Sequence, residues 1–321
     1  MATNFSKGLS VYGIPVLPDL GNKATGNVFF VDSGIGVDAA GVNGKKIDEP
    51  FATIDYAINQ CTANNGDIVY VLPGHAETLN SSGALIPDVA GVSIVGLGWG
   101  ADSPTISMST SGSNESRVGI TGASVRISNI IFRANSTSIG SSSVGIRIGA
   151  DDVILDNCRF DHNSTLSYFE TTIEIPSGSD RVRVENCDFV NKGTTAQADR
   201  AIDISGTGGH VAEMIIGNRF FGNRSGSGVI MGSTDGVYDR FMILNNTIHN
   251  CSTIATDRCI YLPSSQNING GSAGIVSGNF TTSGSSGTLT GLLTVTYFRG
   301  AGNYNINSTG ITINANSIAA S

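Results

Sequence analysis

The sequence predicts an all-β protein, a single-stranded right-handed parallel β-helix whose coils are about 28 residues long. Three observations lead to this fold class. The composition favours short strands and small polar turns, Asn-containing motifs recur at a nearly constant spacing, and one isolated helical pattern precedes the repeat. Together they describe a solenoid with an N-terminal capping helix and an extended N-terminal arm.

The composition excludes several other classes of protein. The 321 residues include 42 Gly but only 8 Pro, and 14% of the residues are charged. Ile and Val occur in short runs, which makes the chain too apolar and too β-branched to be disordered. Ala, Leu, Glu and Lys do not dominate, so long helices are not expected. Short strands joined by small polar turns fit best.

Charge and cysteine content limit which partners and cofactors are expected. The formal net charge is −8 and no Lys/Arg cluster is present, so nucleic-acid binding is not expected. No apolar run reaches the roughly 20 residues that cross a membrane, so no membrane partner is expected. The five Cys residues lack zinc-type spacing, and no metal site, disulfide framework or cofactor is predicted.

Residues 1–26 are predicted to form an extended anchoring arm. Gly and Pro interrupt its apolar stretch, so neither a helix nor a central strand suits it. An apolar segment of this kind needs a cover, and the sequence leaves open whether that is the chain's own fold or a neighbouring subunit. The first seven residues lack the apolar stretch of a secretory signal. The candidate contact residues of the arm are Leu9, Val11, Tyr12, Ile14, Val16 and Leu17.

Residues 27–89 are predicted to form an N-terminal cap with one helix. A short strand over 28–32 is followed by a helical pattern over 51–64, in which Ile54, Ala57, Ile58 and Cys61 share one face. Asn65-Gly66 is expected to end the helix. A buried strand over 67–72 then closes in a Pro-Gly turn. Because the open end of a solenoid exposes its core, this helix is expected to cover the first coil.

Residues 90–283 carry the internal repeat. An Asn follows each Ile/Val-rich strand, and successive copies are separated by 28, 29, 32 and 27 residues. A second strand lies earlier in each period, for example over 144–148, 172–175, 201–204 and 259–262. The repeated asparagines are Asn129, Asn157, Asn186, Asn218 and Asn245.

One period is interpreted as one coil with two or three strands. Equivalent residues then lie above one another at about 4.8 Å, so inward Ile, Val and Phe form continuous ladders. The repeated asparagines are expected to pair their amides along a structural ladder. Cys158 and Cys187 occupy equivalent positions and are expected to be buried thiols. Residues 284–321 lose this register and are predicted to be a C-terminal β cap or an oligomer contact.

The N-terminal module resembles that of pectate-lyase-like β-helix proteins. The resemblance rests on Val28-Phe-Phe-Val-Asp-Ser-Gly, Glu49-Pro-Phe-Ala-Thr-Ile and Gly66-Asp-Ile-Val-Tyr-Val-Leu-Pro-Gly-His-Ala-Glu, and with the repeat it covers residues 28 to about 283. The ending Pro73-Gly74-His75-Ala76-Glu77, behind an apolar arm, is most similar to β-helix proteins of tailed bacteriophage particles. That resemblance implies a head-decoration protein, tail spike or fibre, commonly a homotrimer.

No complete catalytic set is found in the sequence. The acid and histidine signatures of polygalacturonases and the Arg-x-Pro-x-x-Arg motif of pectate lyases are absent. Asp151-Asp152 is interpreted as a turn and Gly208-Gly209-His210 as a loop. The alternative catalytic pair is Glu174 and Asp203, on comparable outward-facing strands of adjacent coils, with Glu213 among the other acids near the Asn corner. The simpler interpretation of these acids is a solvated face neutralised by nearby arginines.

Three functions are consistent with these observations. The favoured one is a non-enzymatic virion protein, a capsid decoration or cement protein. It would bind the major capsid protein or another virion protein through the arm residues named above. The alternatives are a tail spike or fibre that binds or cleaves host polysaccharide, and a cellular adhesin, for which a secretion signal would be expected. The expected location is the outer surface of a phage particle, and the expected assembly is a homotrimer.

Overall fold

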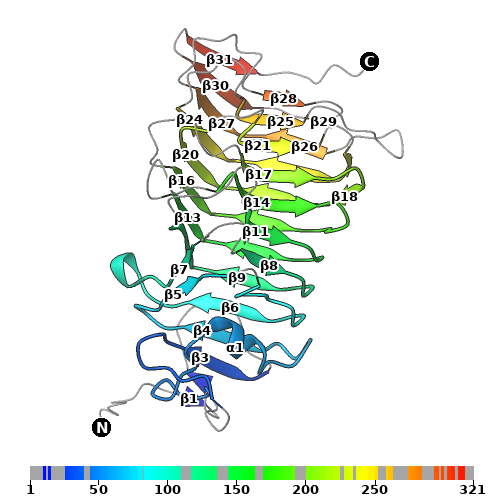
Figure 1. The fold of residues 1–321 in the computed structure, drawn as a ribbon. Coiled ribbons are helices and arrows are strands. Elements are labelled where there is room, and N and C mark those ends of the chain that lie inside the picture. The colour runs from blue at the N-terminus through cyan, green and yellow to red at the C-terminus, as the bar shows by residue number, and fades with distance from the viewer. Residues whose placement is uncertain are drawn as a thin grey trace, which may run out of the picture.

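The computed structural model places most of the chain in one stack of coils (Figure 1). It describes residues 10–11, 14–15, 26–39, 44–81, 83–109, 117–135, 144–162, 169–191, 200–224, 228–233, 236–251, 258–262, 274–283, 293–295, 298–299, 302–307 and 310–314. The chain is an all-β, right-handed parallel solenoid with almost no helix. Three sheets run along its axis, and each full coil contributes one strand to each sheet.

Sheet 1 and sheet 2 each contain ten strands. Sheet 1 consists of β3 (Val28–Val31), β4 (Ile68–Val71), β6 (Ser93–Gly96), β9 (Arg126–Ser128), β12 (Ile154–Asp156), β15 (Arg183–Glu185), β19 (Met214–Ile216), β23 (Phe241–Leu244), β26 (Gly274–Ser277) and β29 (Phe298–Arg299). Sheet 2 consists of β5 (Ala76–Leu79), β7 (Thr105–Met108), β10 (Ile131–Ala134), β13 (Arg159–His162), β16 (Asp188–Asn191), β20 (Arg219–Gly222), β24 (Thr247–Asn250), β27 (Phe280–Ser283), β30 (Asn303–Asn307) and β31 (Gly310–Asn314).

Sheet 3 contains seven strands. Figure 1 shows them stacked in chain order from β8 to β28. They are β8 (Val118–Ile120), β11 (Val144–Ile148), β14 (Thr171–Pro176), β17 (Arg200–Ser205), β21 (Ile230–Gly232), β25 (Ile260–Leu262) and β28 (Leu293–Val295). A small fourth sheet pairs β18 (Gly209–Val211) with β22 (Val237–Asp239) at the corner between sheets 3 and 1. Each full coil therefore has three strands, where the sequence predicted two or three.

The sheets cross the predicted domain boundaries without a break. Strands β3, β4 and β5 of the predicted cap pair in parallel with the coils that follow. Strands β28, β29 and β30 likewise extend sheets 3, 1 and 2 beyond residue 283. The last strand, β31, pairs antiparallel with β30. The solenoid thus begins at β3 and continues to β30.

The predicted helix is present but shorter than its pattern. Helix α1 (Ile54–Ile58) lies against β3 and β4 at the N-terminal end of the stack, and it buries Ile54, Ala57 and Ile58 (Figure 1). It ends before Asn65-Gly66 because the N–H groups of Gln60 and Cys61 bond to carbonyls three residues earlier, which tightens the last turn. A single 3₁₀ turn, η1 (Gly100–Asp102), lies further along the described part of the chain.

The motif Pro73-Gly74-His75-Ala76-Glu77 joins this helix to the first coil. Nδ1 of His75 accepts a hydrogen bond from the N–H of Ser33 at 3.0 Å, so Nε2 carries the proton toward Glu77, 3.3 Å away. Oε2 of Glu77 also accepts from the N–H of Ile54 at the start of α1, at 3.2 Å. The motif that carries the family resemblance therefore has a structural task, which is to satisfy polar groups where three segments meet.

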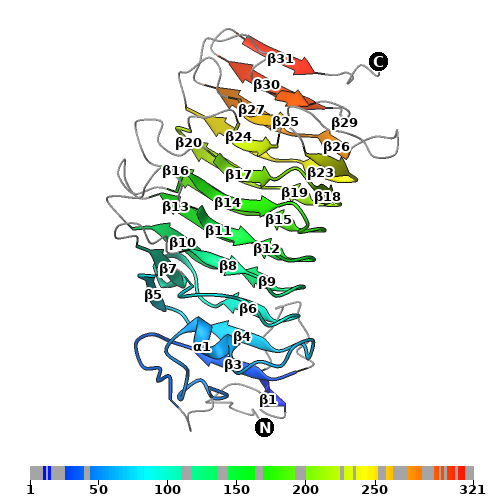
Figure 2. The ribbon, with the colours of Figure 1, turned by 45° about the vertical axis from the view of Figure 1, so that its right-hand side comes forward.

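The predicted arm contains one short antiparallel pair. Strands β1 (Ser10–Val11) and β2 (Ile14–Pro15) pair with each other and belong to none of the solenoid sheets. Figures 1 and 2 both place β1 beside β3 at the N-terminal end of the stack. The other residues of the segment 1–25 lie outside the described residues. The predicted extended arm is therefore described only at this antiparallel pair.

The core consists of side chains that repeat in register from coil to coil. In sheet 2, Phe132, Phe160, Phe189 and Phe220 stack with ring centroids 5.4, 4.6 and 4.5 Å apart. Cys158 and Cys187 lie on successive coils, one residue before two of these strands, as buried free thiols. Burial raises the pKa of the Cys187 thiol well above its ordinary value. Each coil buries its apolar side chains mainly against the coils above and below it.

The asparagine corner contains two columns of residues, where a column is a set of residues in register on successive coils. The outer one, here called the left-handed column, has positive φ throughout. In the order of the chain, its members are Asn129, Asn157, Asn186, Gly217, Asn245 and Gly278. Nδ2 of Asn157 donates to Oδ1 of Asn129 at 3.2 Å, which is one link of the predicted ladder. Asn218 was predicted in this column, but the register of β16 with β20 places Gly217 there instead.

The second set, here called the inner asparagine column, lies one residue later and is buried. It consists of Asn218, Asn246, Asn279 and Asn303. Nδ2 of each of the first three donates to Oδ1 of the next, at 3.0, 2.9 and 3.0 Å. The same oxygens accept from backbone N–H groups, so the column satisfies the polar groups of the corner. The predicted amide ladder is thus formed mainly by different residues.

Candidate functional site

The strongest candidate site lies on the outer face of sheet 3. Its central column contains Gly119, Arg147, Glu174, Asp203 and Met231, which the strand register places directly above one another. The sequence predicts that Glu174 and Asp203 lie on comparable strands of adjacent coils. The structure pairs these two residues in register on β14 and β17.

Each of these two acids is bound by its own arginine. Nη1 of Arg147 lies 2.7 Å from Oε2 of Glu174, and Nη1 of Arg200 lies 2.6 Å from Oδ2 of Asp203. The hydroxyl of Ser205 donates a further hydrogen bond to Oε1 of Glu174, at 3.0 Å. General acid catalysis needs a carboxyl group whose oxygens can reach the substrate, whereas a guanidinium group occupies one oxygen of each of these acids. The geometry therefore suits structural ion pairs better than an acid/base pair.

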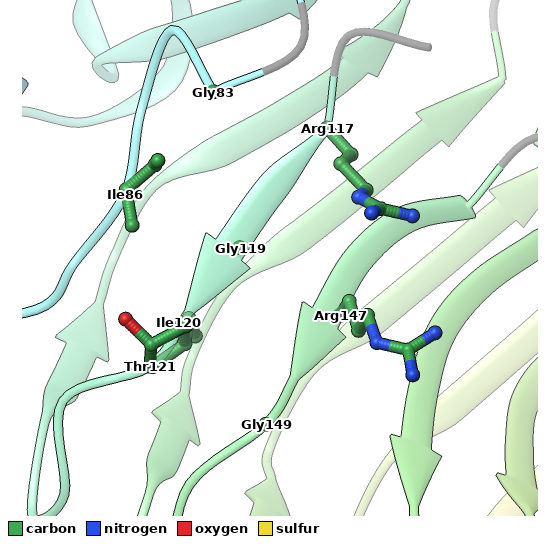
Figure 3. A pocket seen from close by; sticks show the side chains of 8 residues that line it. All are labelled: Gly83, Ile86, Arg117, Gly119, Ile120, Thr121, Arg147 and Gly149. Carbon is green, nitrogen blue, oxygen red and sulfur yellow. The ribbon is translucent and has the colours of Figure 1, made fainter.

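A pocket of about 290 Å³ opens at the N-terminal end of this face (Figure 3). It is lined by Gly83, Ile86, Arg117, Gly119, Ile120, Thr121, Arg147 and Gly149. Glycine keeps it open, because a Cβ added at Gly119 would meet no atom within 4 Å and one at Gly149 would meet only a carbonyl oxygen at 3.6 Å. The floor of this glycine-floored pocket is open because Gly119 on β8 and Gly149, directly after β11, lack side chains in neighbouring columns.

The walls of the glycine-floored pocket differ in chemistry. Figure 3 shows Ile86 on one side of Gly119 and the guanidinium groups of Arg117 and Arg147 on the other. A volume of about 290 Å³ is near the lower end of small-molecule sites, which span roughly 300–1,000 Å³. None of the described lining residues is a carboxylate, imidazole or thiol. The guanidinium groups offer hydrogen-bond donors to a small polar ligand. The one hydroxyl among these lining residues, that of Thr121, has no imidazole, carboxylate or thiol among them to activate it.

The other predicted site residues are dispersed. Asp151-Asp152 forms a bend, as expected, and Arg181 on the next coil bonds to both carboxylates at 3.0 and 2.6 Å. Arg181 lowers the pKa of Asp152 below its ordinary value. The arm residues Val11 and Ile14 lie in β1 and β2. The remaining arm residues, Leu9, Tyr12, Val16 and Leu17, lie outside the described residues.

A buried polar cluster was missed by the sequence analysis. Gly208-Gly209-His210 was interpreted as a loop, yet Gly209–Val211 forms β18 and His210 is fully buried. Glu213 was grouped with outward acids, yet it points inward, with Oε1 3.2 Å from Nδ1 of His210. The ring of Tyr238 stacks on His210 at 5.5 Å. The longer corner between β17 and β19 directs these residues inward, and its unusual length was the one signal of this in the sequence.

Burial dominates the electrostatics of this cluster. Desolvation raises the pKa of the Glu213 carboxyl, although His210 partly offsets the effect. Desolvation also raises the pKa of Tyr238, and the nearby Asp203 and Glu213 carboxylates add to the rise. Tyr238 fills the space left by glycine, since a Cβ at Gly232 or Gly236 would lie 2.3 or 2.7 Å from its hydroxyl oxygen. The cluster is closed, so it contributes to the core rather than to a binding surface.

Metal-binding clusters and membrane-spanning helices are both absent from the described residues. No group of three or more His, Cys, Asp or Glu side chains in the described part of the chain is arranged to hold a metal ion. Within the same residues, no helix has the length and apolar character needed to span a membrane.

Comparison with known proteins identifies the fold but not the chemistry. No protein-family model matches the chain, and no curated protein matches it. Among solved structures, the crystal structure of pectate lyase Pel9A is similar with a TM-score of 0.54 and 12% identity, over 92% of this chain and 79% of that one. A rhamnogalacturonan lyase matches with a TM-score of 0.44 and 12% identity, over 87% of both chains. At this identity, the likeness to the pectate lyase shows a pectate-lyase-like parallel β-helix fold.

Proposed function

We propose that this chain is a structural protein of a bacteriophage particle, a capsid decoration or cement protein held on the outer surface of the head by residues 1–26. The observation that carries the proposal is the state of the two candidate catalytic acids. Glu174 and Asp203 are each bound by an arginine on a continuous sheet face. Such a face supplies rigidity and a patterned surface, which a cement protein needs, in place of a reactive carboxyl pair.

The same pattern of ion pairs extends to the other faces of the solenoid. On sheet 1, Nη2 of Arg126 lies 2.8 Å from Oδ2 of Asp156 on the next coil. On sheet 2, Nε of Arg219 lies 2.6 Å from Oδ1 of Asp188 on the previous coil. Each pair links neighbouring coils, and the parallel ladders beneath hold them in place. A stiff rod of this kind can bridge two sites on a particle with little loss of conformational entropy on binding.

An apolar stretch on sheet 1 supports the expected homotrimer. The outward column that holds Arg126, Ile154 and Arg183 continues as Met214, Met242 and Ile275 before the register reaches Arg299 on the last coil. Ile275 is 42% exposed. The adjacent outward column carries Ile216 and Leu244 at the same level. A contiguous apolar patch of this kind on a sheet face favours burial against another subunit. Three linked arms would bind a particle far more tightly than one arm, through their high effective concentration.

Removal of residues 1–26 tests the anchoring role. The truncated protein should keep its β-rich circular dichroism spectrum and its cooperative unfolding, because the described coils begin at β3. It should no longer bind to particles that lack the protein, as measured by co-sedimentation and by imaging of the particles. Full decoration by the truncated form would contradict the proposal. A second variant, Ile275→Lys with the arm intact, tests the oligomer contact separately from the arm.

The second candidate function is that of a tail spike or fibre that binds or cleaves host polysaccharide. The glycine-floored pocket favours it, because a bound sugar could lie over Gly119 and Gly149 beside two guanidinium groups. Binding is tested by retention of host polysaccharide on the immobilised protein. The variant Gly119→Val should abolish retention, since its side chain would fill the pocket without a backbone clash. If the unmodified chain shortens the polysaccharide and Glu174→Gln or Asp203→Asn does not, the non-enzymatic proposal is overturned.

A further inference from the structure

The interior corner between sheets 2 and 3 contains a buried basic pair, Arg224 and His162. Arg224 is 2% exposed and His162 is 0% exposed. His162 ends β13, and the register of sheet 2 places Asn191 and then Gly222 above it on the next two coils. Arg224 follows Gly222 by two residues. The two basic side chains therefore belong to the same corner of the solenoid, two coils apart.

Most polar atoms of this pair have no acceptor in the part of the chain that the structure describes. Nε, Nη1 and Nη2 of Arg224 make no hydrogen bond to the described residues, and neither does Nδ1 of His162. The acid next to His162 in sequence, Asp161, is on the outer face and lies 3.4 Å from Arg159 and 3.7 Å from Arg133. The alternation of the strand therefore directs the nearest carboxylate in the sequence away from the corner.

The surrounding contacts hold both residues in place. The side chain of Asn250 accepts from the N–H of Arg224 at 3.1 Å and donates to its carbonyl at 3.2 Å, which fixes the backbone. Thr172 Oγ1 lies 3.3 Å from Nε2 of His162, and the ring of Phe169 meets the imidazole edge-on at 5.4 Å. When the Thr172 hydroxyl donates to Nε2, the neutral imidazole carries its proton on Nδ1, which is then a second donor.

The charges at this corner require a compensating acceptor. Burial and the nearby guanidinium lower the pKa of His162 well below its ordinary value, so the imidazole is neutral at physiological pH. Burial lowers the pKa of Arg224 to about 9, so its guanidinium is still a cation there. Burial of an isolated cation is strongly unfavourable unless it is paired. No carboxylate of the described residues bonds to these nitrogens. A partner that fits them accepts hydrogen bonds from nitrogen donors and carries negative charge.

We propose that this corner binds a small monovalent inorganic anion of the halide class, which accepts hydrogen bonds from the Arg224 guanidinium and from Nδ1 of His162. The ligand is small because both basic side chains are almost completely buried, at 2% exposure for Arg224 and 0% for His162. It is an anion because the nitrogens that lack an acceptor, those of the Arg224 guanidinium and Nδ1 of the neutral His162 imidazole, are all hydrogen-bond donors. This proposal is independent of the capsid-binding proposal.

Bromide is the probe that tests this site, because it replaces chloride and scatters X-rays anomalously. Crystals of the full chain grown in sodium bromide should show an anomalous peak in contact with the Arg224 guanidinium. The melting temperature should rise and then saturate as bromide replaces gluconate at constant ionic strength, since gluconate is too large for the corner. A corner that contains only water in these crystals would overturn the proposal.

A matched pair of variants separates this site from general salt effects. Arg224→Met removes the charge and keeps most of the volume, and it should abolish the saturable rise while leaving the melting temperature in gluconate equal or higher. Arg219→Gln removes an exposed arginine of β20, on the same coil, and it should keep the rise. An identical bromide dependence in Arg224→Met and the unmodified chain would contradict the assignment. If Arg224→Met does not fold, the anomalous map of the unmodified chain decides alone.

Discussion

Glu213 occupies a position that earlier coils give to valine. Its column runs from Val125 through Val153 and Val182 to Glu213 and then Phe241, and all five residues point inward. The carboxyl group lies beside His210 rather than in solvent. Burial raises its pKa, because the charged form loses its hydration. One polar residue in an apolar column thus makes the stability of the fold depend on pH.

Substitution of Glu213 by Gln should reveal this dependence. Because the pKa is raised in the folded state, the stability linked to Glu213 is present below the unfolded-state pKa, about 4.3, and is lost as the pH rises through the folded-state pKa. The variant lacks this loss. Urea unfolding at pH 4 and pH 8 should show Glu213→Gln gaining on the order of 1–3 kcal/mol relative to the unmodified chain as the pH rises.

The control for this experiment is Glu185→Gln on the preceding coil. Glu185 faces outward and its Oε2 lies 2.5 Å from Nη2 of Arg183. Loss of this ion pair should not produce a gain with rising pH, since the carboxylate is stabilised by its partner. Parallel pH profiles for Glu213→Gln and the unmodified chain would show that the Glu213 carboxyl is not desolvated in the folded protein.

Among the structural elements, the two columns of the asparagine corner perform different tasks. Residues of the left-handed column turn the chain, and glycine replaces asparagine there at 217 and 278. Residues of the inner asparagine column satisfy buried backbone groups, for which an amide side chain is needed. Asn246, for example, accepts from Asn218 and donates to the carbonyl of Ile215 and to Asn279. Neighbouring asparagines in the sequence are therefore not interchangeable.

Substitutions in the two columns should differ in their effects on stability. Asn157→Gly should change the free energy of unfolding by less than about 1 kcal/mol, because glycine adopts positive φ readily. Asn157→Val should lose about 1–3 kcal/mol, because a β-branched residue is strained there. Asn246→Ala should lose about 3–5 kcal/mol, since several buried donors and acceptors lose their partner. Urea denaturation measures all three, and equal losses at 157 and 246 would refute the distinction.

Over the molecule as a whole, each coil is stabilised by its contacts with the neighbouring coils. The parallel strand pairs of the three sheets join one coil to the next, and the stacked rings from Phe132 to Phe220 follow the same order. In a linear array of this kind, a defect weakens the coils beside it more than distant ones. The solenoid can therefore open locally without unfolding along its whole length.

Substitution of Phe189 by Ala tests this behaviour. The cavity should cost about 3–5 kcal/mol where the ring is lost. Hydrogen exchange measured by mass spectrometry should accelerate in β13, β16 and β20, which flank the cavity, while β4 and β6 near the N-terminal end keep their protection. Uniform acceleration in all strands would show that the stack unfolds as one unit.

The coil repeat, and some of its strands and register pairs, can be predicted from the order of the residues alone. The strand over 144–148 appears with those bounds as β11, and Glu174 and Asp203 lie in register as predicted. These features are predictable because each coil repeats a local pattern of apolar residues and turns. Even so, the repeat did not reveal that Asn218 is offset by one residue from the other predicted asparagines. A shift of one position exchanges inward and outward faces without changing the composition.

Which side chains meet across coils depends instead on the assembled solenoid. Arg147 and Glu174 are 27 residues apart in sequence, yet stacking brings them into an ion pair. The glycine-floored pocket, the inward position of Glu213 and the buried corner of Arg224 likewise depend on corner lengths that set how each coil lies on the previous one. Local patterns specify a strand, whereas contacts between coils depend on the accumulated register of all the turns before them.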